Sequence, residues 1–133
     1  MSEPGWLQWE HHVQDVLGLS STPASGARWH DVGDAVDNDR DSVFPLLADA
    51  KYTDSKLSYS IGHKFWTQWQ QRAAEAGKRF ILPIRIHPHG KGVPADVVAI
   101  GLDDFAELLE LARRGVGAPS GDDILRIALG ERE

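Results

Sequence analysis

Apolar side chains recur with helical periodicity in four stretches of the chain, and each stretch predicts a helix. The stretches are residues 3–17, 60–76 and 103–114, and a short one that begins at Asp122. The second is the clearest, and we expect its buried stripe to consist of Ile61, Phe65, Trp69, Ala73 and Ala76. Gly18 and Gly77 follow the first two stretches, as is typical of the residue after a helix end.

Between the helices the pattern changes to short apolar or alternating runs, which predict strands. We expect strands at residues 27–36, 44–52, 79–86 and 96–101. The polar residues 37–42 have the composition of a turn, so the first two strands should form an antiparallel hairpin. Pro83 in the third strand predicts an edge position or a bulge, because proline cannot donate a ladder hydrogen bond. The order of elements predicts an α/β fold with a mixed sheet flanked by helices.

The composition narrows the class of protein. The chain has 133 residues, of which 41% are hydrophobic, enough for one packed core. We expect a single domain over residues 1–133, with residues 115–133 as a C-terminal helical extension. The absence of cysteine excludes disulfides, thiolate zinc sites and a cysteine nucleophile. No signal peptide or membrane-spanning run is visible, so we expect a cytoplasmic protein, in the host cytoplasm if it is phage-encoded.

The charge is unevenly distributed along the chain. The formal net charge is −6, yet residues 48–93 hold eight basic and three acidic side chains. This locally basic third is either ordinary surface charge or a surface that faces phosphates beside an acidic pocket. On the second interpretation, the candidate DNA contacts are Arg28, Thr53, Lys56, Ser58 and Lys64.

The candidate chemistry lies at the end of the second predicted strand. Asp49 and Lys51 are two positions apart, so their side chains should share one face of the sheet. Apolar neighbours penalise a lone charge at Asp49, so we expect either a salt bridge with Lys51 or a metal ion. Magnesium prefers oxygen ligands, and Asp34, Asp49 and the Ala50 carbonyl would provide them. Such a site could cut phosphodiester bonds. Lys51 would then orient or activate the water that attacks the phosphate, and it would offset the charge of the phosphate.

The order Glu10, Ser25-Gly26, Gly33-Asp34 and Asp49-Ala50-Lys51 resembles the PD-(D/E)XK nuclease superfamily. The resemblance spans roughly residues 6–86 and is greatest to small archaeal and phage-type Holliday junction resolvases. It implies a restriction-endonuclease-like mixed sheet of four to five strands with flanking helices, Mg²⁺ or Mn²⁺ as cofactor, and a homodimer.

The resemblance also implies roles for individual residues. Glu10, Asp34, Asp49 and Lys51 take the catalytic positions, with Glu10 reaching the metal directly or through water, and Ser25 supports the phosphate. Gly-Asp replaces the usual Pro-Asp, and Asp49 replaces the more usual glutamate. Two neighbouring acids, Asp31 and Asp37, are alternatives to Asp34.

These observations predict a metal-dependent DNA endonuclease that hydrolyses phosphodiester bonds in branched DNA. The preference for branches rests on the resemblance alone. A restriction-type, flap or single-strand nuclease of the same fold is an alternative. So is a catalytically inactive nuclease-fold module that binds DNA.

Overall fold

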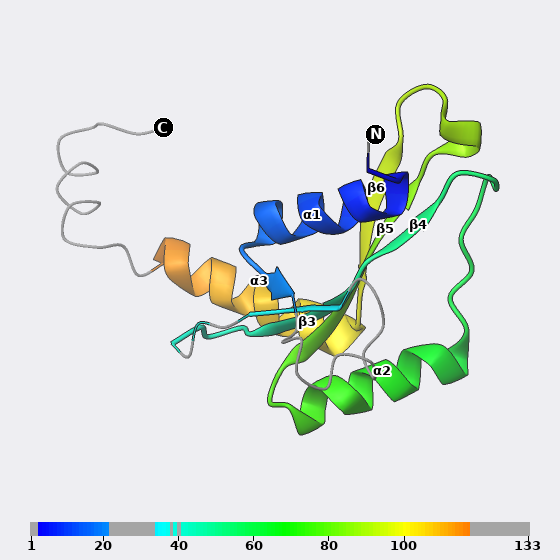
Figure 1. The fold of residues 1–133 in the computed structure, drawn as a ribbon. Coiled ribbons are helices and arrows are strands. Elements are labelled where there is room, and N and C mark those ends of the chain that lie inside the picture. The colour runs from blue at the N-terminus through cyan, green and yellow to red at the C-terminus, as the bar shows by residue number, and fades with distance from the viewer. Residues whose placement is uncertain (1–2, 22–33, 38, 40, 118–133) are drawn as a thin grey trace, which may run out of the picture. The chain divides into compact units, whose positions relative to one another are not determined.

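The computed structural model describes residues 3–21, 34–37, 39 and 41–117. The chain falls into two compact units, Met1–Gly101 and Leu102–Glu133. The elements are α1 (Gly5–Leu17), β1 (Ser20–Ser21), β2 (Asp34–Val36), β3 (Leu46–Asp49), β4 (Lys51–Thr53), α2 (His63–Glu75), β5 (Arg79–Ile86), the 3₁₀ helix η2 (Pro88–Gly90), β6 (Ala95–Ile100) and α3 (Leu102–Gly117) (Figure 1).

The strands of the first unit form one mixed sheet, which confirms the predicted α/β class. β2 is antiparallel to β1 and to β3, so the predicted hairpin is confirmed. β3 and β4 both run parallel to β5, and β6 is antiparallel to β5. Within the described residues the sheet has six strands. Because β3 and β4 pair with β5 in the same register, they are two halves of one interrupted strand.

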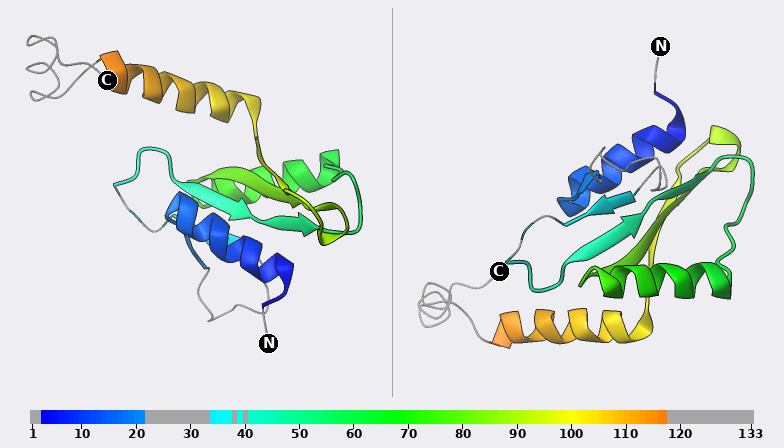
Figure 2. Two further views of the ribbon diagram at one scale, coloured as in Figure 1. Left: turned by 90° about the horizontal axis from the view of Figure 1, so that it is seen from above. Right: turned by 60° about the horizontal axis from the view of Figure 1, so that its bottom comes forward.

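The two helices of this unit cover opposite faces of the sheet (Figures 1 and 2). Trp9 and Val13 of α1 pack on Ala50 and Tyr52. On the α2 face, the ring of Phe80 stacks on Trp69 with the ring centroids 5.2 Å apart. The buried cluster on this face consists of Leu47, Trp69, Ala73, Phe80, Leu82 and Ile84. Because side chains alternate along a strand, those of odd-numbered β3 residues lie on the α2 face of the sheet and those of even-numbered residues on the α1 face.

Pro83 does not lie at an edge of the sheet, so the edge alternative of the prediction is wrong. β5 is paired along both sides, with β3 and β4 on one and β6 on the other. Pro83 falls between the register pairs Ala48–Ile81 and Lys51–Ile84, level with the break at Ala50. Its carbonyl accepts a hydrogen bond of 3.3 Å from the Trp9 indole. A central proline is tolerated here because the ladder is interrupted beside it.

The first three predicted helices are confirmed with changes at their ends. α1 ends before Gly18, which has φ 67° in the left-handed region that glycine favours. α2 is shorter than predicted, so Ile61 and Ala76 lie outside it and are exposed, while Trp69 and Ala73 are buried. The predicted buried stripe extends past both ends of α2. Periodicity along the sequence shows which residues share a helix face, but it does not show where the helix stops packing on the sheet.

Other predictions fall partly or wholly outside the described residues. Of the predicted strand 27–36, the structure describes only the last three residues, which form β2. The short helix expected from Asp122 lies outside the described part, as does most of the 115–133 extension. In α3, Arg114 forms an ion pair of 3.3 Å with Glu110.

Among the described residues, no helix combines the length and apolar character needed to cross a membrane.

A bidentate ion pair joins β5, β6 and α1. Arg85 donates two hydrogen bonds to Asp96, of 2.7 and 2.8 Å, and the two residues are register partners. The guanidinium also lies 4.8 Å from the centroid of the Trp9 ring. The hydrogen bonds from Arg85 hold the pKa of Asp96 below its usual value, so folding favours the ionised carboxylate.

We expect Asp96→Asn to lower the free energy of unfolding at pH 7 by about 1 kcal/mol or less, because Asp96 is 37% exposed. The folded-state pKa lies below the reference value of 3.8. The stabilisation is therefore complete above that value and is lost as the pH falls through the folded-state pKa. Urea denaturation from neutral to acid pH measures this, with Asp54→Asn at an exposed position as control. If Asp96→Asn lowered the free energy of unfolding by the same amount at every pH, the ionised Asp96 carboxylate would not be the source of the stabilisation.

Candidate functional site

The end of β3 places a charged pair inside the sheet. The Asp49 side chain is fully buried, and the Nζ atom of Lys51 lies 3.2 Å from its Oδ2 atom. The Lys51 side chain is 30% exposed and lies on the same face, where its Nζ atom is 5.9 Å from the centroid of the Phe65 ring. The salt bridge considered from the sequence is thus present. Ligation of a metal ion by Asp49 stays a prediction.

The position of this pair follows from strand geometry and from the apolar sequence around it. Asp49 has the same parity as Leu47, which is buried against α2, so the sheet carries Asp49 into the core. A buried carboxylate costs several kcal/mol unless it is paired. Lys51 follows at the next position of that parity, and its four-carbon stem brings the ammonium back to the carboxylate.

The backbone places a second acid beside Asp49. In the β2–β3 register, Asp34 is the direct partner of Asp49, and such partners share one face of a sheet. Asp37 lies beyond the other end of β2, where its backbone N–H donates to the Leu46 carbonyl over 3.0 Å. The Asp37 carboxylate accepts a hydrogen bond of 3.1 Å from the backbone of Asp39, so it belongs to the turn. Asp31 lies outside the described residues.

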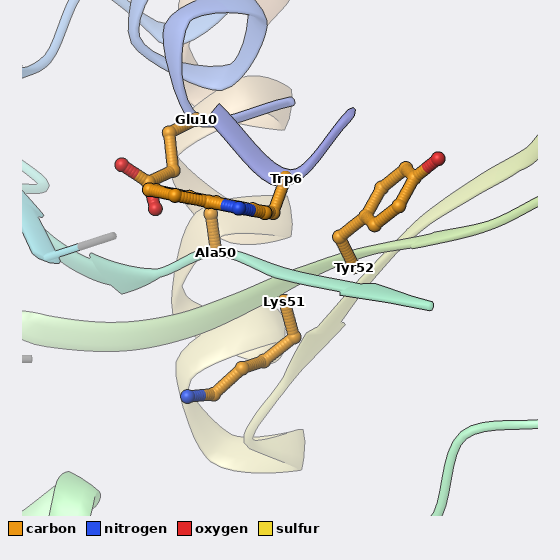
Figure 3. Close-up of a pocket in the computed structure, with 5 residues that line it drawn as sticks. All are labelled: Trp6, Glu10, Ala50, Lys51 and Tyr52. Atoms are coloured by element: carbon orange, nitrogen blue, oxygen red, sulfur yellow. The ribbon is translucent and has the colours of Figure 1, made fainter. Parts of the chain in front are cut away.

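Glu10 enters the same region from α1. It is 9% exposed, and it lines an open pocket of about 360 Å³ together with Trp6, Ala50, Lys51 and Tyr52. Figure 3 shows Glu10 and Trp6 on the α1 side of the strand, whereas Lys51 extends from the opposite side. The Glu10 carboxylate and the Lys51 ammonium both point toward the β3 end of the strand (Figure 3). The acid and the charged pair therefore approach Ala50 from two faces of the sheet.

The side chains that the structure describes include no ready-made cluster of three His, Asp or Glu residues for a metal ion. The ligands proposed from the sequence, Asp34, Asp49 and the Ala50 carbonyl, nevertheless have the chemistry that suits Mg²⁺. Carboxylate and carbonyl oxygens are the hard ligands that Mg²⁺ prefers, and the two aspartate positions are adjacent across β2 and β3.

The candidate DNA contacts separate into three groups. Lys56 and Ser58 are exposed in the segment between β4 and α2, and Lys64 is exposed in the first turn of α2. Thr53 ends β4, is only half-buried, and accepts a hydrogen bond of 2.9 Å on its carbonyl from the His87 backbone. The other two candidates, Ser25 and Arg28, lie outside the described residues.

Tyr59 is not one of the candidate DNA contacts given above, although its hydroxyl group belongs to the same polar loop as Lys56 and Ser58. It is half-buried and packs against the cluster on the α2 face. Burial raises its pKa, and Lys51 and Asp49 act on it with opposite signs, so its hydroxyl lies in the field of the charged pair. The available signal was an aromatic residue with a hydroxyl group, placed between a basic loop and a helix start.

Comparison with known proteins gives no match to a family model, to a curated protein or to a solved structure. The interpretation of the site therefore depends on its own geometry and chemistry.

We expect Lys51→Met, measured in EDTA, to lower the free energy of unfolding by about 2–3 kcal/mol. This is less than for a fully enclosed pair because Lys51 is 30% exposed. The double variant Asp49→Asn/Lys51→Met should recover most of the loss, since it leaves no charge at position 49 or 51.

Urea denaturation of Asp49→Asn, Lys51→Met and the double variant measures the coupling between the two residues. Lys56→Met, at an exposed position, is the matched control and should change stability by less than about 0.5 kcal/mol. A loss in the double variant equal to the sum of the two single losses would show that the ion pair does not stabilise the fold.

Proposed function

We propose that this protein is a metal-dependent DNA endonuclease of the PD-(D/E)XK type that hydrolyses phosphodiester bonds in branched DNA. The observation that supports this most directly is the acid-x-lysine pair at the break between β3 and β4. The buried Asp49 lies 3.2 Å from Lys51, and a second aspartate is its register partner on β2. This proposal includes a restriction-endonuclease-like arrangement of the mixed sheet and a cytoplasmic location.

The proposed cofactor is Mg²⁺, with Mn²⁺ as a substitute. Asp34, Asp49 and the Ala50 carbonyl would hold the ion, and Glu10 would complete the set, directly or through water. When bound, such an ion lowers the pKa of a coordinated water and offsets the negative charge of the phosphate. The adjacent aspartate positions support this assignment, because one buried carboxylate alone would be a poor magnesium site.

The protein's own groups have separate tasks in this proposal. Lys51 pairs with Asp49 inside the core, and its partly exposed ammonium can also approach a phosphate oxygen. The Tyr59 hydroxyl is protonated at neutral pH, as in any tyrosine, and burial raises its pKa further, so it is available as a hydrogen-bond donor near the charged pair. Both groups stabilise negative charge on the phosphate by electrostatics and hydrogen bonding.

Exposed lysine and serine side chains would hold the DNA backbone. Lys56, Ser58 and Lys64 follow Lys51 along the chain and leave their polar groups accessible to solvent. Together with Ser25 and Arg28 they would contact phosphates, which fix orientation without reading sequence. A homodimer would place two sites around a two-fold axis, as paired cuts in a junction require.

A second candidate function keeps the DNA contacts without the chemistry. The 3.2 Å contact between Asp49 and Lys51 also fits an ion pair that serves only to stabilise the fold. A catalytically inactive DNA-binding module would then be the correct description. Restriction-type, flap and single-strand nucleases share the same site and differ only in substrate.

We expect Asp49→Asn and Lys51→Ala to reduce cleavage by several powers of ten, equivalent to about 4 kcal/mol or more of transition-state stabilisation. The measurement is the rate of cutting labelled four-way, flap, nicked, single-stranded and continuous duplex DNA with Mg²⁺ or Mn²⁺. Asp54→Asn is the control with the same chemical change at an exposed position.

Two results would contradict the endonuclease proposal. One is that the wild-type protein leaves every substrate intact with either metal. The other is that Asp49→Asn retains full cleavage. A readout independent of cleavage is the thermal midpoint, which Mg²⁺ should raise in the wild type and not in Asp49→Asn.

We expect Lys56→Ala and Lys64→Ala to weaken DNA binding with little effect on the cleavage rate at saturation. Each lost phosphate contact should lower the slope of log affinity against log salt by about 1. Binding is measured by fluorescence anisotropy in EDTA over a salt series. Lys78→Ala, beyond the opposite end of α2 from Lys64, is the matched control. An unchanged salt slope in both test variants would remove these lysines from the DNA interface.

A further inference from the structure

The first turn of α1 leaves a tryptophan partly exposed beside the candidate site. Trp6 is 45% exposed, whereas Trp9 is only 4% exposed and donates its indole N–H to the Pro83 carbonyl. α1 is therefore anchored on the sheet by Trp9, while much of the Trp6 ring stays in contact with solvent. Large aromatic side chains in contact with solvent beside a pocket are typical of ligand contacts.

The pocket that Trp6 lines has a second aromatic wall, Tyr52, and the start of α1 lies close to this ring. A Cβ atom at Gly5 would lie 2.5 Å from the Tyr52 hydroxyl oxygen, so a larger residue at position 5 would displace the end of the tyrosine side chain. Figure 3 shows the Trp6 ring over Ala50 and the Tyr52 ring on the same side of the strand. Two aromatic side chains thus border one open space.

The remaining wall residues define the kind of ligand that fits. Glu10 contributes a carboxyl group to the wall, which is a hydrogen-bond acceptor, while Lys51 lines the pocket from the strand and its amino group extends from the opposite side (Figure 3). The volume of about 360 Å³ is at the lower end of the range for small-ligand sites. Aromatic walls with a few polar groups suit a flat, neutral ligand that has hydrogen-bonding edges, and a nucleobase has this chemistry.

We propose that the pocket between Trp6 and Tyr52 binds an unpaired nucleobase, so that the substrate is DNA with a single-stranded or unstacked nucleotide beside the cleaved bond. This inference rests on the proposed endonuclease function. The base would occupy the α1 side of the strand, while its phosphate would reach Lys51 past Ala50. Stacking on an aromatic ring requires a base that has left the duplex, which makes the pocket selective for distorted DNA.

The test measures binding without cleavage. Wild-type protein in EDTA is titrated into oligonucleotides that carry 2-aminopurine, either unpaired at a junction or paired within a continuous duplex. We expect Trp6→Ala to weaken binding to the unpaired probe about 10-fold to 100-fold, and to change duplex binding little. Trp6→Phe should restore most of the affinity. Phe105→Ala is the matched control, because Phe105 is exposed to a similar extent, 47%.

A second variant keeps the proposal testable if Trp6→Ala does not fold, as judged by urea denaturation. Gly5→Ala pushes a methyl group against Tyr52, and it should selectively weaken binding of the unpaired probe. Equal effects of Trp6→Ala on both probes would overturn the proposal. So would a Trp6→Ala protein that loses self-association in sedimentation and keeps its affinity for the unpaired probe, since a second copy of the chain would then be the occupant.

Cleavage assays distinguish a failure of the base pocket from a failure of the proposed endonuclease activity. Wild-type protein that cuts DNA, with a Trp6→Ala variant that keeps the preference for unpaired nucleotides, overturns the base pocket alone. Wild-type protein that cuts no DNA overturns the proposed endonuclease. Loss of the preference in Trp6→Ala, with the cutting of continuous duplex unchanged, supports both.

Discussion

A fully buried carboxylate beside a break in the central strand is the constraint on which the rest of the site depends. Asp49 requires a cation inside the core, and Lys51, two positions further on, supplies one at 3.2 Å. The break at Ala50 lies level with Pro83, which lacks the N–H that a continuous ladder would use. The charged pair and the strand irregularity thus occupy the same place in the sheet.

This arrangement divides the candidate site between the two faces of the sheet. The ion pair lies on the α2 face with Phe65, while Glu10 and the aromatic pocket lie on the α1 face. Only the strand around Ala50 separates them, and its small side chain keeps that barrier thin. In the proposed function, one face would supply electrostatic stabilisation and the other a surface for a flat ligand.

The proposed functions differ in how they explain the same buried pair. A structural ion pair explains Lys51, yet it gives no reason for a second aspartate as the register partner of Asp49. Two acids at paired positions of neighbouring strands are unfavourable by themselves, and the proposed divalent cation gives a reason for this arrangement. The endonuclease proposal accounts for both acids, for Lys51 and for the exposed lysines that follow.

The sequence by itself determined the features that depend on local periodicity. These are the α/β class, the hairpin of β2 and β3, and the shared face of Asp49 and Lys51, because a strand alternates every two residues. Only the tertiary structure decided the central position of Pro83, the exposure of Trp6 and the approach of Glu10 from the opposite face. Each of these depends on which distant segment packs beside the residue, and the pattern of neighbours along the chain carries no record of that partner.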